Sequence, residues 1–275
     1  MEKKGLDIKN TIQKRQIYFS RAYRHLEPNK KEQWLFLLLF VLPSLILFLI
    51  FYTKVSYALS IWVKHALSAC IPNSCLGIAY SNFLPVFGGI YYVQTQNLLP
   101  SDQEVIINLA LTIVLLAVGL FSSRNKKGGT PLSIYFAIVL LLHLIACIYF
   151  TFAKEFFPYS ATKYSELYML QQVGIWMSFL VLAGLVTGIV GYGRIAGKLL
   201  TFLAIIIYSF IFGCVRYLTF LFIVSAASSL YMTTLFFSLG PLYDFLYLVC
   251  IYSIFINVQI KHFDQGEGRL KWHWM

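Results

Sequence analysis

Acidic residues are scarce in this chain, which has 11 Asp and Glu against 22 Lys and Arg among 275 residues. Charged residues of both signs make up only 12% of it, too few for the surface of a soluble domain, whereas 59% hydrophobic residues fit a multi-span membrane protein. The net charge of +11 does not indicate nucleic acid, because the Lys and Arg lie in the gaps between apolar runs, where they act as orientation signals. The composition therefore predicts one membrane domain in the lipid bilayer and no nucleic-acid partner.

Metal-binding and common catalytic motifs are also missing. The five cysteines occur without a CxxC pair or a Cys/His metal spacing, so we expect no structural zinc or haem site. The sequence contains no phosphate-binding loop, no paired catalytic carboxylates and no Ser-His-Asp candidate at a membrane face. It also lacks internal repeats and paired broken spans, which argues against a transporter or channel. We therefore expect no metal and no cofactor.

Long apolar runs are what the chain has in abundance. A run of about 20 apolar residues can cross the ~30 Å hydrocarbon core. The predicted spans are Trp34–Tyr52, Glu104–Phe121, Pro131–Phe152, Leu170–Tyr192, Leu199–Ala227 and Leu230–Val258. With the N-terminus inside, the cytoplasmic segments hold 17 of the 22 Lys and Arg, and the outer loops hold four. This asymmetry predicts an all-α polytopic membrane protein with six transmembrane helices and both termini cytoplasmic.

The segments outside the spans divide the chain further. Residues 1–33 carry nine Lys and Arg, with apolar residues at spacings near 3.6, so they form either a basic cytoplasmic amphipathic segment on an anionic leaflet or a polar tail with chance spacing. The six-span membrane domain covers 34–258, with outer loops at 53–103 and 153–169, and 259–275 is a cytoplasmic tail. In the first outer loop Cys70 and Cys75 flank a Pro-Asn turn, which allows a disulfide or two free thiols.

Arg216 lies inside the apolar run Leu199–Ala227, where a charge costs about 2.5–3.5 kcal/mol on insertion scales. Such a residue either snorkels or pairs structurally, or it faces a functional site. At ~1.5 Å per residue, Arg216 lies roughly 25 Å from the inner end of its span and Asp244 roughly 21 Å from the inner end of the next. The similar depths predict an Arg216–Asp244 contact. The alternative is an unpaired, protonated Asp244.

Helical spacing predicts which faces of these spans meet. We expect a small and polar face of the fifth span to pack on a matching face of the sixth. The first face consists of Ser209, Gly213, Arg216 and Thr219, and the second of Thr233, Phe237, Gly240, Asp244 and Tyr247. In the fourth span Gly184 and Gly188 form a small-xxx-small pair, whose expected use is close helix packing.

His143 and Cys147 are four residues apart on the third span and share a face. With Arg216 at a similar depth they could form a base, a nucleophile and an anion stabiliser. The other interpretation is a buried apolar Cys beside a hydrogen-bonded His. Cys214 is a weaker candidate because it points away from Arg216 on the helix.

A family pattern can be compared with three positions between residues 167 and 258. Gln172-Val173-Gly174 stands at the outer start of one span, Arg216 within Val215-Arg216-Tyr217 in the next, and Phe236 near the outer start of the last, with Gly240 beyond it. In this arrangement Leu167–Val258 resembles the core of the exosortase/archaeosortase family, membrane cysteine transpeptidases that process sorting tails on secreted proteins, in many bacteria beside exopolysaccharide assembly. The family has Cys-x-Gly, Arg and His at these places, so Gln172 and Phe236 replace its nucleophile and its base.

The resemblance implies a multi-pass protein of the bacterial inner (cytoplasmic) membrane, and the two replacements imply that it is non-catalytic. It would bind a peptide tail, a lipid-linked substrate or a membrane protein partner in an outer-leaflet groove near Arg216. The expected binding residues are Arg216, Asp244, Gln172 and Thr233. Two alternatives remain open: an active membrane cysteine peptidase or transpeptidase that uses Cys147, His143 and Arg216, and a structural subunit or transport component of a membrane complex.

Overall fold

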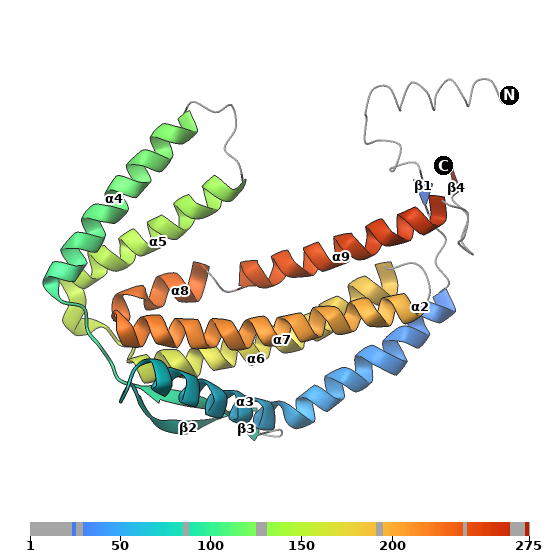
Figure 1. Ribbon diagram of the computed structural model, residues 1–275, viewed down its shortest axis with the longest axis horizontal. Helices are drawn as coiled ribbons and strands as arrows, with labels where there is room; N and C mark the ends of the chain where they lie inside the picture. The colour runs from blue at the N-terminus through green and yellow to red at the C-terminus, as the bar shows by residue number, and fades with distance from the viewer. Residues whose placement is uncertain are drawn as a thin grey trace. The chain divides into compact units, whose positions relative to one another are not determined.

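The computed structural model describes residues 24–25, 30–84, 88–124, 131–190, 195–238, 241–264 and 273–274. Most of the predicted segment 1–33 and most of the tail 259–275 lie outside these ranges. The elements in chain order are β1 (Arg24–His25), α2 (Lys30–Phe36), the π-helix η2 (Leu37–Val41), α3 (Leu42–Cys70), β2 (Cys75–Leu84), β3 (Gly88–Thr95), α4 (Asp102–Arg124), α5 (Pro131–Ala153), the 3-10 helix η3 (Lys154–Phe156), α6 (Ala161–Leu185), the π-helix η4 (Val186–Val190), α7 (Ile195–Ala226), the 3-10 helix η5 (Ser229–Tyr231), α8 (Met232–Ser238), α9 (Pro241–Asp264) and β4 (His273–Trp274) (Figure 1).

The chain is a mostly helical, multi-pass membrane protein. Five helical segments within the described residues are long and apolar enough to cross a membrane: Lys31–Cys70, Asp102–Gly119, Ser133–Phe156, Ala161–Gly188 and Ile195–Ala226. The first of them continues past Tyr52, where the sequence predicted the span to end, and reaches Cys70. A shorter apolar helical stretch, Leu246–Val258, follows in α9.

The predicted sixth span is not one continuous helix. Its residues are divided among η5, α8 and α9, and α9 begins at Pro241. Proline has no N–H to donate inside a helix but fits its first turn, which explains the new start. The single face predicted to run from Thr233 to Tyr247 is therefore wrong, because Thr233 and Phe237 lie on α8 whereas Asp244 and Tyr247 lie on α9. Gly240 lies outside the described residues.

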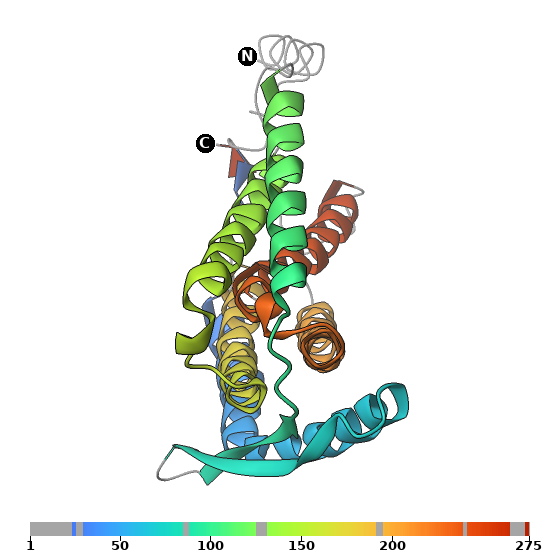
Figure 2. The same cartoon turned by 90° about the vertical axis from the view of Figure 1, so that its left-hand side faces the viewer.

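The all-α prediction also missed a β-hairpin in the segment 53–103, which was predicted to be an outer loop. β2 and β3 pair antiparallel, with a regular register from Gly77 opposite Gln94 to Asn82 opposite Gly89. Figure 2 shows this hairpin beside α3. The strands approach closely at Gly89, where an added Cβ would collide with the carbonyl of Ser81. Burial raises the pKa of the Tyr92 phenol in β3 above its ordinary value.

Hydroxyl groups from three helices satisfy the edge of β3 that faces away from β2. Three of the four residues bonded in this way, Tyr91, Val93 and Thr95, alternate along the strand, as its pleat requires, whereas Gly88 lies beyond a register shift. The hydrogen bonds run from Tyr52 to the Gly88 carbonyl at 2.7 Å, from the Tyr91 amide to Ser56 at 3.2 Å, from Ser60 to the Tyr91 carbonyl at 3.0 Å, from the Val93 amide to Tyr217 at 3.1 Å and from Thr162 to the Thr95 carbonyl at 3.2 Å. β3 is thereby fixed to α3, α6 and α7.

The chain divides into two compact units. The larger comprises residues 44–180 and 206–247, and its core contains Tyr168 and Tyr217, whose rings stack with centroids 5.5 Å apart. The smaller comprises residues 1–43, 181–205 and 248–275. In it, a Cβ at Gly184 would lie 2.5 Å from Val41, and one at Gly188 would lie 2.9 Å from Phe36. The predicted use of Gly184 and Gly188 in close packing is therefore confirmed.

Candidate functional site

The centre of the candidate site is the guanidinium of Arg216 on α7, which is only 5% exposed. Its Nη1 donates to Oδ2 of Asp244 on α9 at 2.7 Å, and its Nη2 donates to Oε1 of Gln172 on α6. Asp244 and Gln172 are themselves buried. The predicted contact between Arg216 and Asp244 is therefore confirmed, and the same charge joins α6, α7 and α9.

Gly213, one turn before Arg216 on α7, leaves room for this arrangement. At Gly213 a Cβ would collide with the side-chain amide of Gln172 and would lie 3.1 Å from Trp176. Ser209, Gly213 and Arg216 are all buried, as their shared face predicts. The fourth predicted member of that face, Thr219, is exposed and donates to the carbonyl of Val215 at 2.8 Å, so the prediction was wrong there. Threonine can satisfy its hydroxyl within its own helix, which removes the need for a buried partner.

Aromatic rings and hydroxyl groups complete the surroundings of the ion pair. The guanidinium carbon of Arg216 lies 5.7 Å from the ring centroid of Tyr168 and 5.5 Å from that of Phe212. A cation within about 6 Å of a ring centroid is attracted by the ring's quadrupole. Tyr247 on α9 lies close to both Asp244 and Ser209. The positive charge is thus opposed by a carboxylate, an amide oxygen and two rings, which together offset the cost of its burial.

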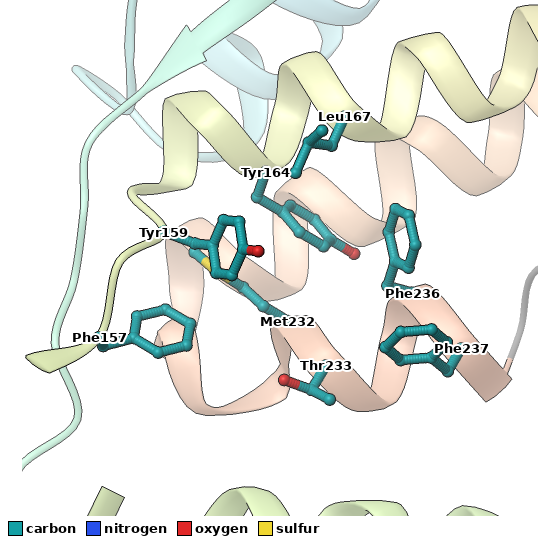
Figure 3. Close-up of a pocket in the computed structure, with 8 residues that line it drawn as sticks. All are labelled: Phe157, Tyr159, Tyr164, Leu167, Met232, Thr233, Phe236 and Phe237. Carbon is teal, nitrogen blue, oxygen red and sulfur yellow. The ribbon is translucent and has the colours of Figure 1, made fainter. Parts of the chain in front are cut away.

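A cavity of about 140 Å³ lies in the same unit (Figure 3). Its walls come from the segment after η3, from α6 and from α8. The lining residues are Phe157, Tyr159, Tyr164, Leu167, Met232, Thr233, Phe236 and Phe237. The wall is almost entirely apolar and aromatic, and hydroxyl groups of Tyr159, Tyr164 and Thr233 interrupt it. Thr233, a predicted binding residue, lies here rather than beside Arg216.

Tyr164 is the side chain that links the cavity to the Arg216 cluster. It is 4% exposed, and its hydroxyl has no hydrogen-bond partner among the described residues. Its ring lies 6.3 Å from the ring of Phe236 across the cavity and 6.3 Å from the ring of Tyr168, which in turn packs on Arg216. Figure 3 shows the hydroxyl directed toward Phe236. Arg216 is thus separated from the cavity by two tyrosine rings and does not line it.

The structure does not bring His143 and Cys147 into the contacts found for Arg216. Nδ1 of His143 lies 3.0 Å from the hydroxyl of Thr234, and its ring stacks on Tyr231 with centroids 5.4 Å apart. Cys147 is buried in an apolar cluster with Val105, Ala146, Phe150 and Leu230. These contacts match the interpretation of a buried apolar cysteine near a hydrogen-bonded histidine.

The two cysteines of the predicted disulfide, Cys70 and Cys75, are free thiols in the structure. Cys70 is exposed at the end of α3, and the sulfur of Cys75 lies 3.9 Å from the carbonyl oxygen of Lys64. Of the two alternatives left open by the sequence, the structure therefore contains the reduced one.

Sequence reasoning missed the tyrosines that build the site. Tyr164 and Tyr168 are four residues apart and lie on one face of α6, and Tyr217 follows Arg216 directly. The oxygen of Tyr217 accepts from the Val93 amide and shares a hydrogen bond with Ser165 at 2.6 Å. The i,i+4 spacing on α6 was available as a signal, but tyrosines are too common in this chain for spacing alone to select them.

Comparison with known proteins identifies no relative. No protein-family model matches the chain, and searches of curated proteins and of solved structures likewise find no match. Any functional assignment must therefore start from the geometry described above.

Proposed function

We propose that the chain is a non-catalytic, exosortase-like protein of the bacterial inner membrane, which crosses it six times with both termini in the cytoplasm. Its function is to bind, from the outer leaflet, an apolar group of a peptide tail, a lipid-linked substrate or a membrane protein partner. The observation that carries this proposal is the aromatic cavity with the buried, unpartnered hydroxyl of Tyr164 in its wall. Few polar groups within a mainly apolar concave wall are typical of ligand sites.

The size of the cavity limits what enters it. At about 140 Å³ it is close to the engineered cavity of about 150 Å³ that binds benzene, so it accommodates one aromatic ring or one branched apolar group. A whole lipid chain would have to extend beyond it. A ligand that inserts a single ring also gains the edge-to-face contacts that rings such as Phe236 and Tyr164 offer. An extracytoplasmic peptide segment with an aromatic side chain fits this description best.

Three positions of the family resemblance support the same proposal. Gln172 replaces the Cys of the family pattern, and Arg216 retains its Arg; the two side chains are hydrogen-bonded to each other. Phe236 stands at the place of the family's His and lines the cavity. An amide and a phenyl ring supply neither nucleophile nor base, so the arrangement suits binding without bond cleavage. The burial of Arg216 and its pairing with Asp244 and Gln172 give it the role of positioning the helices rather than of receiving a ligand's carboxylate or phosphate.

The alternative of an active cysteine peptidase gains less support. It would need Cys147 beside Arg216, whereas Cys147 packs among apolar side chains of α4, α5 and η5. A structural role in a membrane complex is favoured by one observation, the buried Arg216–Asp244 pair, but that role leaves the cavity without a purpose.

A photocrosslinking experiment tests the binding proposal. p-Benzoylphenylalanine replaces Phe237, which lines the cavity and is 62% exposed, and in a matched control it replaces Ile145, which is 55% exposed on α5. Irradiation of intact cells should give a discrete peptide or lipid-linked adduct at position 237, and filling the cavity with Thr233→Trp should remove it. The proposal fails if both positions yield the same bulk-lipid adducts or if Thr233→Trp changes nothing.

A further inference from the structure

The strand β2 has one edge paired with β3 and one edge that is open. Because the main-chain groups of Tyr91 and Val93 bond to helix hydroxyls, they face away from β2. In an antiparallel pair, two residues directly opposite each other direct their main-chain N–H and C=O groups either both toward the partner strand or both away from it. The residues opposite Tyr91 and Val93 are Tyr80 and Ile78, so their N–H and C=O groups point outward from the hairpin.

These outward groups have no partner in the described part of the chain. Outside the β2–β3 ladder, no hydrogen bond between described residues reaches the main chain of Ile78 or Tyr80. The contrast with β3 is sharp, since β3's own outer edge is bonded to side chains of α3, α6 and α7. A hairpin in which one edge is satisfied in detail and the other is open presents a row of donors and acceptors to another strand.

β2 also lacks the features by which natural edge strands avoid pairing. Its ten residues include no proline and no charged residue, although the chain carries a net charge of +11. The two register shifts fall near its ends and leave Gly77–Asn82 regular. Leu76 and Tyr80 are 66% and 47% exposed. The edge is therefore long enough, regular enough and accessible enough to accept a strand.

The absence of charge indicates which strand fits. Surfaces of this chain that carry Lys and Arg would repel one another in a pair of copies, whereas two β2 strands meet without opposing like charges. We propose that β2 pairs antiparallel with β2 of a second copy of this chain, so that two hairpins form one four-stranded sheet. A two-fold axis perpendicular to the strands generates this arrangement, and such closed dimers are the commonest assemblies. The inference is independent of the ligand cavity.

The register follows from the outward-facing residues. Ile78 of one copy lies opposite Tyr80 of the other, and their main-chain groups form the new hydrogen bonds. Ala79 then meets its symmetry mate at the two-fold axis in a non-hydrogen-bonded pair, where Cα atoms approach to about 4.5 Å and the small side chain of alanine fits without a clash. A β-branched residue opposite an aromatic one is also a favourable cross-strand pair.

The test uses differently tagged copies of the full-length protein, expressed together and reconstituted in lipid nanodiscs. The wild-type chain should run as a dimer by native mass spectrometry, and the two tags should purify together. Tyr80→Lys alone and Tyr80→Glu alone should each lose the dimer, whereas Tyr80→Lys mixed with Tyr80→Glu should regain it. Tyr80→Pro, which removes one outward N–H and spares the hairpin ladder, should also lose it.

Leu99→Lys and Leu99→Glu are the matched controls, because Leu99 is exposed, apolar and outside β2. These variants should remain dimeric. Hydrogen exchange of Gly88–Thr95 shows whether a Tyr80 variant has kept its hairpin, since Tyr80 also packs on Tyr91 at 5.0 Å. A wild-type monomer in lipid, a dimer unaffected by Tyr80→Lys, or a different polypeptide bound along β2 would overturn the proposal.

Discussion

At the scale of single residues, Arg216 is held by partners that cannot be removed one at a time without leaving a buried charge. Asp244→Asn takes the carboxylate from a guanidinium that is 5% exposed. Removal of one partner of a buried pair typically costs about 3–5 kcal/mol, because the remaining charge is desolvated and uncompensated. We therefore expect Asp244→Asn to lower the free energy of unfolding by that amount, measured by denaturation with dodecyl sulfate in bicelles.

A second ion pair of the same chain provides the control. Lys154 and Asp102 lie 3.1 Å apart, but the side chain of Asp102 is 88% exposed, so Asp102→Asn should leave stability almost unchanged. The double variant Arg216→Gln with Asp244→Asn should cost less than the sum of its two single variants, since it leaves no isolated charge. Equal effects of Asp244→Asn and Asp102→Asn would show that the Arg216 pair is not buried in the membrane protein.

Substitution by alanine should change the stability of the protein in opposite directions at two glycines, Gly174 and Gly213. A Cβ at Gly213 collides with the Gln172 amide, whereas one at Gly174 meets nothing within 4 Å. Gly174→Ala should stabilise the helix by about 0.5–1 kcal/mol, the usual gain in a helix interior. Gly213→Ala should lower stability, because the new methyl group displaces Gln172 from Arg216. Thermal unfolding in detergent measures both changes.

Shortening the displaced side chain provides the check on that explanation. Gln172→Ala should cost less in the Gly213→Ala background than in the wild-type chain, because there it also removes the clash with the new methyl group. If the two substitutions were simply additive, the proposed contact between Gly213 and Gln172 would not limit the structure.

Sequence alone could locate the charged residues of the site but not its aromatic walls. Arg216 and Asp244 stand out because charges are rare in apolar runs and because their depths match. Tyr164, Tyr168 and Tyr247 do not stand out, since the chain has 19 tyrosines and many of them lie in apolar runs. Which of these rings meet depends on the rotation of each helix, and that is decided by packing across the whole unit.

At the scale of secondary-structure elements, Tyr217 determines how the hairpin is attached to the helices. Its oxygen accepts the Val93 amide and shares a hydrogen bond with Ser165, and the residue is completely buried. Tyr217→Phe leaves the packing of the ring intact but leaves a buried N–H without an acceptor, which costs about 1–3 kcal/mol. We expect faster amide exchange in β3, centred on Val93, when the variant is followed by hydrogen exchange and mass spectrometry.

The exposed Tyr208 supplies the control for this substitution. Tyr208→Phe removes a hydroxyl from a residue that is 47% exposed, and β3 should exchange as in the wild-type chain. Protection of Val93 that survives Tyr217→Phe would mean that another group satisfies the edge of β3.

Helices that are determined by the length and hydropathy of an apolar run were predicted well. Elements that depend on a turn, or on contacts with a segment distant in sequence, were predicted poorly. The apolar runs that become α4, α5 and α7 are long and uninterrupted, so each was found within a few residues. The prediction for α6 was wrong at its start, because this helix begins at Ala161 rather than at Leu170. The sixth run contains Pro241, where α9 begins, so this run does not form the single predicted helix. The hairpin was missed because β3 is fixed by helix hydroxyls distant in sequence, such as Ser60 and Tyr217, which no local pattern reveals.

At the scale of the whole molecule, the number of membrane crossings depends on α9. The apolar stretch Leu246–Val258 is about 20 Å long at ~1.5 Å per residue, which is shorter than the ~30 Å hydrocarbon core. Asp244 lies just before this stretch, and its charge is compensated by pairing with Arg216. The part of α9 from Pro241 to Leu246 can therefore also lie in the membrane, which lengthens the segment that is available to cross it. The distribution of Lys and Arg predicts the same crossing, because Lys261, Arg269 and Lys271 follow it.

Reporter fusions at the two ends of the chain distinguish six crossings from five. With six, a fluorescent protein that matures only in the cytoplasm should be bright at either terminus, and alkaline phosphatase, active only outside, should be inactive at both. Five crossings would place the termini on opposite sides. Asp244→Lys opposes two cations at the Arg216 pair and should impair insertion of α9, dimming the C-terminal fluorescence while the N-terminal signal is unchanged. An active C-terminal phosphatase in the wild-type chain would contradict the sixth crossing and the ion pair's contribution to it.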